Sequence, residues 1–498
     1  MADSTTPTAA PQAATPPQTP RATSNRSTTP VSAEFARYIA ADWAERADAT
    51  PGARAQASFA ASRRSRISAL HEGARLIIPA GAAKTRSNDT DYPYRAHSAF
   101  AYLTGWGSDT VAGSVLVLEP TAAGHEATLY FREGAGRDTD EFYANSDIGE
   151  FWTGARPTLA NVAADLGLST APLGELAHAL AEPAATSISI DVDGDADDGD
   201  ASKGGATEGD SGAALLRELS ELRLVKDEFE LAELRTAVAA TKLGFDDVIA
   251  DLGQIAAHPR GERLVEGTFN RRARLEGNTV GYDTIAASGP HACILHWTRN
   301  DGPVMPGDVI LIDAGIELDS YYTADITRTL PVNGTFSEVQ RRVYGAVLDA
   351  ADAAFAIVRP GIRFREIHAA AMTVVAQRTA DWGLLPVSAE ESLKPEHQYH
   401  RRYMVHGTSH HLGLDVHDCA QARRELYLDG ILEPGMVFTI EPGLYFQPDD
   451  LSVPAEYRGI GVRIEDNILV TETGAENLSI GIPRTADDVE AWLARGRA

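Results

Sequence analysis

The chain has 498 residues, of which 43% are hydrophobic, and its formal net charge is −27. This length exceeds what one hydrophobic core usually supports, so we expect two or three domains. The negative charge argues against nucleic acid and anionic membrane surfaces as partners, because both require clustered Lys and Arg. No apolar run is long enough to span a membrane.

The first 31 residues are rich in Ser, Thr, Pro and Ala and contain no long apolar stretch. This composition predicts a disordered tail and argues against a secretory signal. Two cysteines, Cys293 and Cys419, are too few for a disulfide framework, so we expect a cytoplasmic protein. A small buried thiol is the ordinary state of such residues, and this interpretation is favoured over a cysteine nucleophile.

Residues 32–188 mix helical stretches, such as 34–46, with apolar strands, such as 115–118. Alternation of this kind predicts an α/β domain. After a more polar segment, residues 214–490 begin with helix-like apolar spacing over 227–252 and continue with strand pairs and further helices at 337–358 and 363–380. Spacing alone therefore predicts an α+β second domain.

The segment between the two domains, residues 189–213, is acidic and rich in Gly. From Asp191 to Asp210 it contains eight acidic residues and one lysine, and almost nothing apolar. A calcium loop would need Gly at its sixth position and Glu at its twelfth, where Ala196 and Ser202 stand. We therefore expect a solvated linker or loop insertion.

Carboxylates end several apolar runs of the second domain. Asp313 follows the run 309–312, Glu441 follows 436–440, and Asp325 lies within 322–327. Such residues brought into one low-dielectric pocket would repel each other strongly and would need positive counter-charge. We interpret five residues as one dinuclear metal site: Asp313, Asp325, His410, Glu441 and Glu465.

An oxygen-rich ligand set with one imidazole favours Mn, Fe, Co or Zn. We expect two divalent ions per chain, with Mn(II) first and Co, Zn or Fe as alternatives. A pair of bridged metals activates water and polarises the group under attack, so the predicted reaction class is hydrolysis.

Two pairs of polar residues need separate interpretation. His406 and His410 have the spacing of a helical zinc motif, but Gly407 and the missing Glu favour a strand that leads into a loop, with His410 the only imidazole ligand.

Arg463 and Glu465 alternate with apolar residues, so we expect both on one face of a strand, with the Arg hydrogen-bonded to acidic ligands.

The motifs resemble aminopeptidase P, the Xaa-Pro aminopeptidase group of the pita-bread metallopeptidases. The matching strings of the second domain are 282–285, 293–296, 311–315, 325–329, 406–410, 413–418, 441–445 and 463–466, and those of the first domain are 86–95 and 100–105. The resemblance implies an α/β amino-terminal domain followed by an α+β pita-bread (creatinase/aminopeptidase-like) catalytic domain. The stretch from Asp313 to Asp325 is one residue longer than expected of common members, and a β-bulge in the turn would absorb that residue.

The resemblance also implies roles for individual residues. Asp313 binds one metal, Asp325 and Glu465 bridge both, and Glu441 is a ligand that also moves the proton of the attacking water. His296, His406, His417 and Arg463 act in catalysis, and the substrate pocket is lined by these four residues together with Tyr282, Val416 and Tyr445. The implied reaction removes the first residue of peptides with proline in second position.

Alternatives remain at this point. A prolidase, which cleaves Xaa-Pro dipeptides, shares the metal motifs. A metal-free pita-bread binding module belongs to another functional class, but the presence of all five ligands disfavours it, and the same ligands exclude a creatinase-like hydrolase. We expect peptide substrates and a homo-oligomer, either a dimer or a tetramer.

Overall fold

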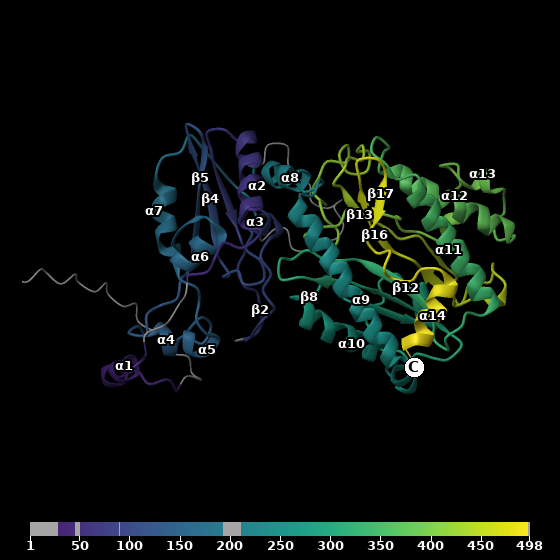
Figure 1. The fold of residues 1–498 in the computed structure, drawn as a ribbon, viewed down its shortest axis with the longest axis horizontal. Helices are drawn as coiled ribbons and strands as arrows, with labels where there is room; N and C mark the ends of the chain where they lie inside the picture. The colour runs from purple at the N-terminus through teal and green to yellow at the C-terminus, as the bar shows by residue number, and fades with distance from the viewer. Residues whose placement is uncertain (1–27, 45–49, 89, 193–210, 497–498) are drawn as a thin grey trace, which may run out of the picture. The chain divides into compact units, whose positions relative to one another are not determined.

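The computed structural model describes residues 28–44, 50–88, 90–192 and 211–496 (Figure 1). The chain divides into two compact units, one made of residues 1–48 and 134–156 and the other of 49–133 and 157–498. Most of the predicted acidic linker, residues 193–210, and most of the predicted tail lie outside the described residues. No described helix is both long and apolar enough to cross a membrane.

The smaller unit contains three short helices, α1 (Ala33–Ala40), α4 (Glu141–Ala144) and α5 (Glu150–Thr153). The Ser32 hydroxyl caps α1 by accepting the Phe35 N–H at 3.1 Å. The expectation of a helix over 34–46 is wrong at its carboxyl end, because α1 ends at Ala40, where extended backbone follows and Asp42 has φ 60°.

The amino-terminal part of the larger unit is built on a five-stranded sheet in the order β6-β5-β4-β1-β7. The central pairs are antiparallel and the edge pairs, β5 with β6 and β1 with β7, are parallel. The strands are β1 (Ala74–Pro79), β4 (Val115–Thr121), β5 (Gly124–Phe131), β6 (Ser169–Pro172) and β7 (Thr186–Ser189). Strand β4 confirms the strand expected at 115–118.

Helices and a small hairpin complete this part. They are α2 (Ala57–Leu70), β2 (Thr85–Ser87), β3 (Thr90–Asp91), α3 (Ser98–Thr104), α6 (Leu159–Leu166), η1 (Leu173–Glu175) and α7 (Leu176–Ala181).

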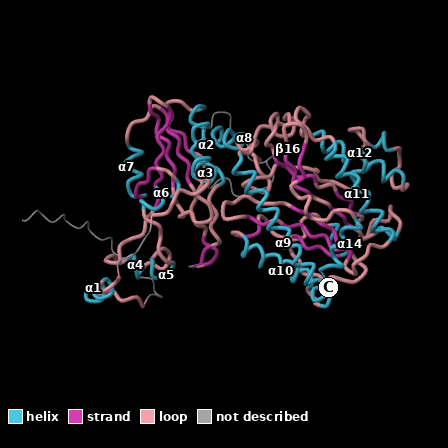
Figure 2. Tube along the Cα trace, viewed as in Figure 1, coloured by secondary structure: helices cyan, strands magenta, loops and turns pink. Residues whose placement is uncertain are grey.

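Two three-stranded sheets form the centre of the carboxyl-terminal part, and helices pack around them (Figure 2). One sheet has the order β12-β10-β9, with β9 (Ile285–Ser288), β10 (Val309–Ala314) and β12 (Ile326–Pro331). The other has the order β13-β16-β17, with β13 (Val437–Ile440), β16 (Asp466–Val470) and β17 (Ala475–Asn477). Two-stranded pairs join β8 (Thr279–Val280) to β11 (Ile316–Glu317), and β14 (Gly443–Tyr445) to β15 (Gly461–Arg463).

Two long helices of this part begin at a capping box. Asp227 and Glu230 form a capping box at α9, and Ser337 and Gln340 form one at α11. The helices are α8 (Ser211–Leu222), α9 (Glu228–Ala257), α10 (Gly261–Glu276), α11 (Glu338–Ala356), α12 (Arg365–Asp381), α13 (Ala389–Ser392) and α14 (Ala486–Gly496), with 3₁₀ turns η2 (Gly289–Cys293), η3 (Tyr399–Arg402) and η4 (Ala455–Tyr457). The three helices predicted at 227–252, 337–358 and 363–380 are confirmed, although α9 continues to Ala257.

The turn predicted between Asp313 and Asp325 is a tight hairpin. Pairing continues without a register shift from Ala314 with Ile326 to Glu317 with Thr323. The irregularity is confined to the loop 319–321, where Tyr321 has φ 72°. A left-handed residue at the end of a three-residue loop is the usual way for a hairpin to bulge at its turn. The strands that flank the loop, and with them Asp313 and Asp325, therefore stay in register.

Candidate metal centre and substrate pocket

The five predicted ligands come together from the ends of different strands. Asp313 lies in β10 and Asp325 directly precedes β12, while Glu441 directly follows β13 and Glu465 lies between β15 and β16. His410 comes from the irregular segment before β13, which forms a bridge to that strand between His411 and Phe438. The Thr439 N–H also donates to the His410 carbonyl at 2.9 Å.

Backbone contacts between the two sheets bring their ligands together. The Glu465 N–H donates to the Thr327 carbonyl at 3.1 Å, and the Asp325 N–H donates to Asn467 Oδ1 at 3.2 Å. The expected unbroken strand through Arg463 and Glu465 is wrong, because β15 ends at Arg463 and β16 starts at Asp466. Both side chains nevertheless reach the same site.

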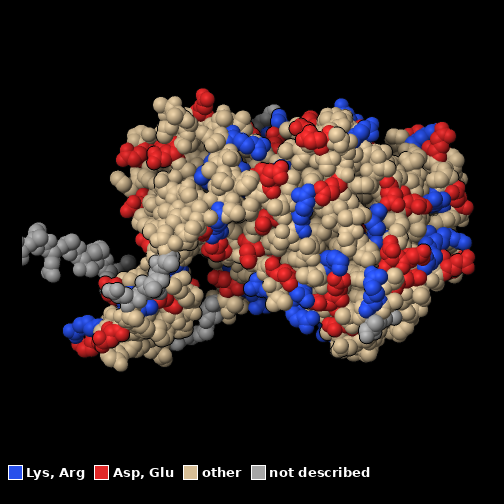
Figure 3. Space-filling view, viewed as in Figure 1, with Lys and Arg blue, Asp and Glu red and all other residues tan. Residues whose placement is uncertain are grey.

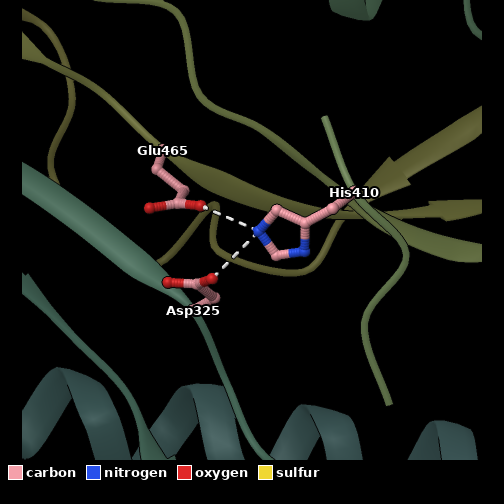
Figure 4. Close-up of side chains that lie close together, drawn as sticks. All are labelled: Asp325, His410 and Glu465. Atoms are coloured by element: carbon pink, nitrogen blue, oxygen red, sulfur yellow. Dashed lines mark ion pairs between the residues drawn. The ribbon is translucent and has the colours of Figure 1, made fainter. Parts of the chain in front are cut away.

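His410 Nε2 is the point on which the carboxylates converge (Figure 4). It lies 3.2 Å from Asp325 Oδ2, 3.7 Å from Glu441 Oε1 and 3.9 Å from Glu465 Oε1. Donor atoms of Asp325, His410 and Glu465 all lie within 4.8 Å of one another. Asp313 is linked to this group through the Tyr282 hydroxyl, which is 2.7 Å from Asp313 Oδ1 and 2.5 Å from Asp325 Oδ1.

The ring orientation of His410 suits a metal ligand. Nδ1 lies 3.1 Å from the His411 carbonyl, which can only accept, so Nδ1 carries a proton. In the neutral ring Nε2 is then left with a free lone pair that faces the carboxylates. A hydrogen bond of this kind to the second ring nitrogen is the usual support of a ligating histidine.

The electrostatics of the site fit divalent cations. Burial raises the pKa of Glu441 to about 7. The charges of Asp325 and Asp313 add to this shift, and the positive charges of His410 and Arg463 oppose it. Burial and the neighbouring carboxylates also raise the pKa of Glu465 well above its ordinary value. Burial opposes a charged His410, but the hydrogen bond to Asp325 and the carboxylate charges outweigh it and raise its pKa to about 9. Without metal, the site therefore retains protons that reduce the repulsion between its carboxylates. With metal, two cations would supply that positive charge.

A chain of hydrogen bonds leads from the metal site toward the substrate side. Arg463 is buried, and its Nη2 donates to Asp313 Oδ2 at 2.5 Å while its Nη1 donates to the Tyr445 hydroxyl at 3.0 Å. That hydroxyl lies 2.8 Å from Nε2 of His406, whose Nδ1 donates to the Gly407 carbonyl at 2.6 Å. Burial, reinforced by Arg463, lowers the pKa of His406 to about 3, so the ring is neutral and accepts the Tyr445 proton.

His417 packs edge-on against His410, with ring centroids 4.5 Å apart. Burial, together with the charge on His410, lowers its pKa to about 4, and His296 contributes to the same shift, so His296 lies nearby. The His296 side chain is exposed. Val416 is partly buried and packs against an apolar cluster that includes residues of the amino-terminal domain, such as Phe100 and Leu103.

Three residues that sequence reasoning did not assign to the site support it. The Thr327 hydroxyl donates to Glu465 Oε2 at 2.7 Å and accepts from Arg463 Nε at 3.1 Å. Asn467 Nδ2 donates to the Asp325 carbonyl at 2.5 Å, and the fully buried Arg328 donates to the Glu465 carbonyl at 2.6 Å. Thr327 and Asn467 could have been found in the sequence, because each lies two positions after a proposed ligand, Asp325 or Glu465, and so on the same face of a strand.

Comparison with known proteins places both parts of the chain. Residues 232–472 match Metallopeptidase family M24, and residues 59–189 match Aminopeptidase P, N-terminal domain. Xaa-Pro aminopeptidase 1 of Streptomyces coelicolor is 50% identical over 93% of this chain and 92% of its own length.

Solved structures agree with this. An aminopeptidase PepP of Pseudomonas aeruginosa has a TM-score of 0.74 at 29% identity, with 89% of this chain and 99% of that chain covered. A zinc-substituted Escherichia coli aminopeptidase P in complex with product has a TM-score of 0.73 at 30% identity, with 89% and 99% covered. The predicted pita-bread catalytic domain and its amino-terminal partner domain are thereby confirmed. The chain belongs to the Xaa-Pro aminopeptidase (aminopeptidase P) family of M24 metallopeptidases.

Proposed function

We propose that this chain removes the first residue from peptides that carry proline in second position, and that the five-ligand site is where it does so. The observation that carries the proposal is the convergence of Asp325, Glu441 and Glu465 on His410 Nε2, next to the chain that runs from Arg463 to His406. Hydrolysis needs water activation and stabilisation of negative charge on oxygen, and both kinds of group are present.

The five residues, Asp313, Asp325, His410, Glu441 and Glu465, would hold two divalent ions. Mn(II) suits a set of four carboxylates and one imidazole, and Co, Zn or Fe would also fit. When bound, such ions lower the pKa of water and polarise the scissile carbonyl.

The chain's own residues then bind, orient and move protons. Glu441 takes the proton of the attacking water and passes it toward the leaving proline nitrogen, a transfer worth roughly 10²–10⁴-fold in rate. His417 and His296 offer N–H groups to the carbonyl oxygen as it becomes negative, and such a donor contributes about 3 kcal/mol. Arg463 fixes Asp313 and, through Tyr445, the orientation of His406.

Proline is accepted because the site does not require an N–H at the scissile bond. The X-Pro amide lacks that donor and its ring restricts the backbone, which keeps it out of most clefts that bind extended chain. The imidazoles of His296, His406 and His417, with Val416 and Arg463, would surround the ring.

The decisive experiment is a digest of a small peptide panel with the Mn(II)-loaded protein. We expect Xaa-Pro-Yaa peptides to lose their first residue and the matched Xaa-Ala-Yaa peptides to be cut at least about tenfold more slowly, the lower end of what a pocket discriminates by shape. Cleavage of Xaa-Pro dipeptides with Xaa-Pro-Yaa left intact would instead identify a prolidase.

Removal of metal should destabilise the protein. A ligand present at 100 times its Kd stabilises the native state by about 2.7 kcal/mol per site, so chelation should lower the melting temperature and Mn(II) should restore it. Differential scanning calorimetry with elemental analysis tests this, with Co, Zn and Fe compared in parallel. An unchanged melting temperature after both ions are removed would contradict the assigned site.

The proposed partners are peptides and further copies of the chain, in the cytoplasm. On the face shown in Figure 3, Lys and Arg side chains are interspersed with Asp and Glu and form no continuous basic stripe, which accords with a peptide substrate and not with nucleic acid. A dimer or tetramer is expected, and light scattering at several concentrations would test this.

A further inference from the structure

The loop that carries two of the proposed substrate residues is closed by two backbone hydrogen bonds, from the Asp418 N–H to the His411 carbonyl at 2.9 Å and from the Gly413 N–H to the Asp415 carbonyl at 3.1 Å. Val416 and His417 lie in an irregular segment between the bridge at His411 and the turns that follow Asp418. Among the described residues, the His417 ring packs against one other ring, that of His410. The backbone of this substrate loop, residues 413–418, therefore decides where the His417 ring lies.

An arginine of the amino-terminal domain holds this loop. Nη2 of Arg95, which lies between β3 and α3, donates to the Leu414 carbonyl at 2.6 Å. Its Nη1 donates to Ser98 Oγ at 3.1 Å, and that hydroxyl donates to Asp415 Oδ1 at 2.5 Å. Two consecutive residues directly before Val416 and His417 are thus fixed by groups from outside the catalytic domain.

The same guanidinium also holds the hairpin between two metal ligands. Arg95 Nε donates to Glu317 Oε2 at 2.7 Å, and the guanidinium carbon lies 4.6 Å from the centre of the Tyr321 ring. Glu317 and Tyr321 both lie in the hairpin that joins Asp313 to Asp325. All three side-chain nitrogens of Arg95 therefore donate hydrogen bonds. A lysine, with a single ammonium group, cannot reach all of these acceptors at once.

The far side of the substrate loop is anchored within the segment that precedes α9. Arg223 Nη2 lies 3.1 Å from Asp415 Oδ2 and 3.1 Å from Asp418 Oδ1, and Lys226 Nζ lies 3.0 Å from Asp418 Oδ2. Buried cations thus hold Asp418, and Arg223 shares Asp415 with Ser98. The side-chain hydrogen bond to the Leu414 carbonyl comes from Arg95.

We propose that Arg95 is a positioning residue for the reaction, through which the amino-terminal domain sets the place of His417 within its own chain. The inference rests on the role proposed above for His417. It assigns the amino-terminal domain a part in transition-state stabilisation without any direct contact with substrate.

Arg95→Gln should lower kcat/KM on an Xaa-Pro-Yaa peptide by about 10–100-fold, the usual cost of losing a group that orients a functional residue. Metal content should be unchanged, because no ligand atom contacts Arg95. Amide hydrogen exchange in residues 411–418 of the metal-free protein should become faster. Arg95→Lys should recover only part of kcat/KM.

Two comparisons separate positioning from general destabilisation. Arg75 is the control, since like Arg95 it donates to a carboxylate, Glu119 at 2.6 and 2.8 Å, and to backbone carbonyls, but these partners all lie within the amino-terminal domain. It is more deeply buried than Arg95, so its loss should cost at least as much stability. Arg75→Gln should lower the melting temperature without changing kcat/KM or exchange in the substrate loop.

A double-mutant cycle supplies the second comparison. If Arg95 acts through His417, Arg95→Gln added to His417→Ala should cost less than about threefold, because coupled residues are not additive. An undiminished loss in that background, or wild-type kcat/KM for Arg95→Gln, would overturn the role of Arg95 in an enzyme that is otherwise active. Failure of the unmodified Mn(II) protein on every peptide of the panel would instead refute the proposed function itself.

Discussion

Replacement of Asp325 by Asn should abolish turnover, with a loss of at least about 10³-fold in kcat/KM. Loss of a single oxyanion donor costs about 10²–10³-fold, and we expect the proposed metal ligand Asp325 to contribute at least as much. The amide offers one acceptor oxygen in place of two, and it removes one of the negative charges that converge on His410 Nε2. The change therefore affects both the charge and the geometry of the metal site.

The fold should survive this substitution. Asp325 is held by its backbone, whose N–H donates to Asn467 Oδ1 at 3.2 Å and whose carbonyl accepts from Asn467 Nδ2 at 2.5 Å. Neither contact depends on the carboxylate. We expect a melting temperature close to that of the metal-free wild type, while elemental analysis shows fewer than two metals per chain.

Asp308→Asn provides a matched control, because Asp308 directly precedes the same strand, β10, at the end opposite Asp313. This control should keep both its metals and its activity. Wild-type activity of Asp325→Asn in metal-supplemented buffer, with two metals still bound per chain, would show that Asp325 is not a bridge.

Two of the proposed metal ligands, Asp313 and Glu441, were suggested by the sequence because each directly follows a strongly apolar run. Asp313 and Glu441 follow four or more apolar or β-favouring residues, and these runs form strands that are buried along their whole length. A carboxylate at such a strand end has few reasons to be there other than chemistry. The long helices were also predictable, because Asp227 and Ser337 supply capping boxes just before amphipathic segments.

Other features depend on contacts between distant segments, which no local pattern records. The break between Arg463 and Glu465 arises where the chain passes from pairing with β14 to pairing with β13. Tyr282, expected only as a pocket residue, contacts two of the proposed metal ligands, Asp313 and Asp325, because β9 and β10 are neighbours in the sheet. Arg95 contacts a loop 319 positions further along the chain.

His417→Ala should reduce kcat/KM on Xaa-Pro-Yaa peptides by about 10²-fold while both metals remain bound. The ring is neutral, because burial lowers its pKa. A neutral imidazole can donate an N–H to an oxygen that becomes negative, and loss of such a donor costs about 3 kcal/mol. None of the His410 contacts that converge on the carboxylates involves His417, so the metal site should stay intact.

The substitutions that accompany His417→Ala decide what the ring contributes. His417→Asn keeps a side-chain N–H and should recover part of the lost rate if hydrogen-bond donation matters, whereas a purely steric role predicts no recovery. His258→Ala, at the carboxyl end of α9, is the control for loss of an imidazole elsewhere and should leave kcat/KM unchanged.

The preference for Xaa-Pro-Yaa over Xaa-Ala-Yaa should fall in His417→Ala, because the ring forms one side of the proposed proline pocket. Equal losses on both peptides would assign His417 to oxyanion stabilisation alone, and loss of bound metal would show that it supports His410 directly.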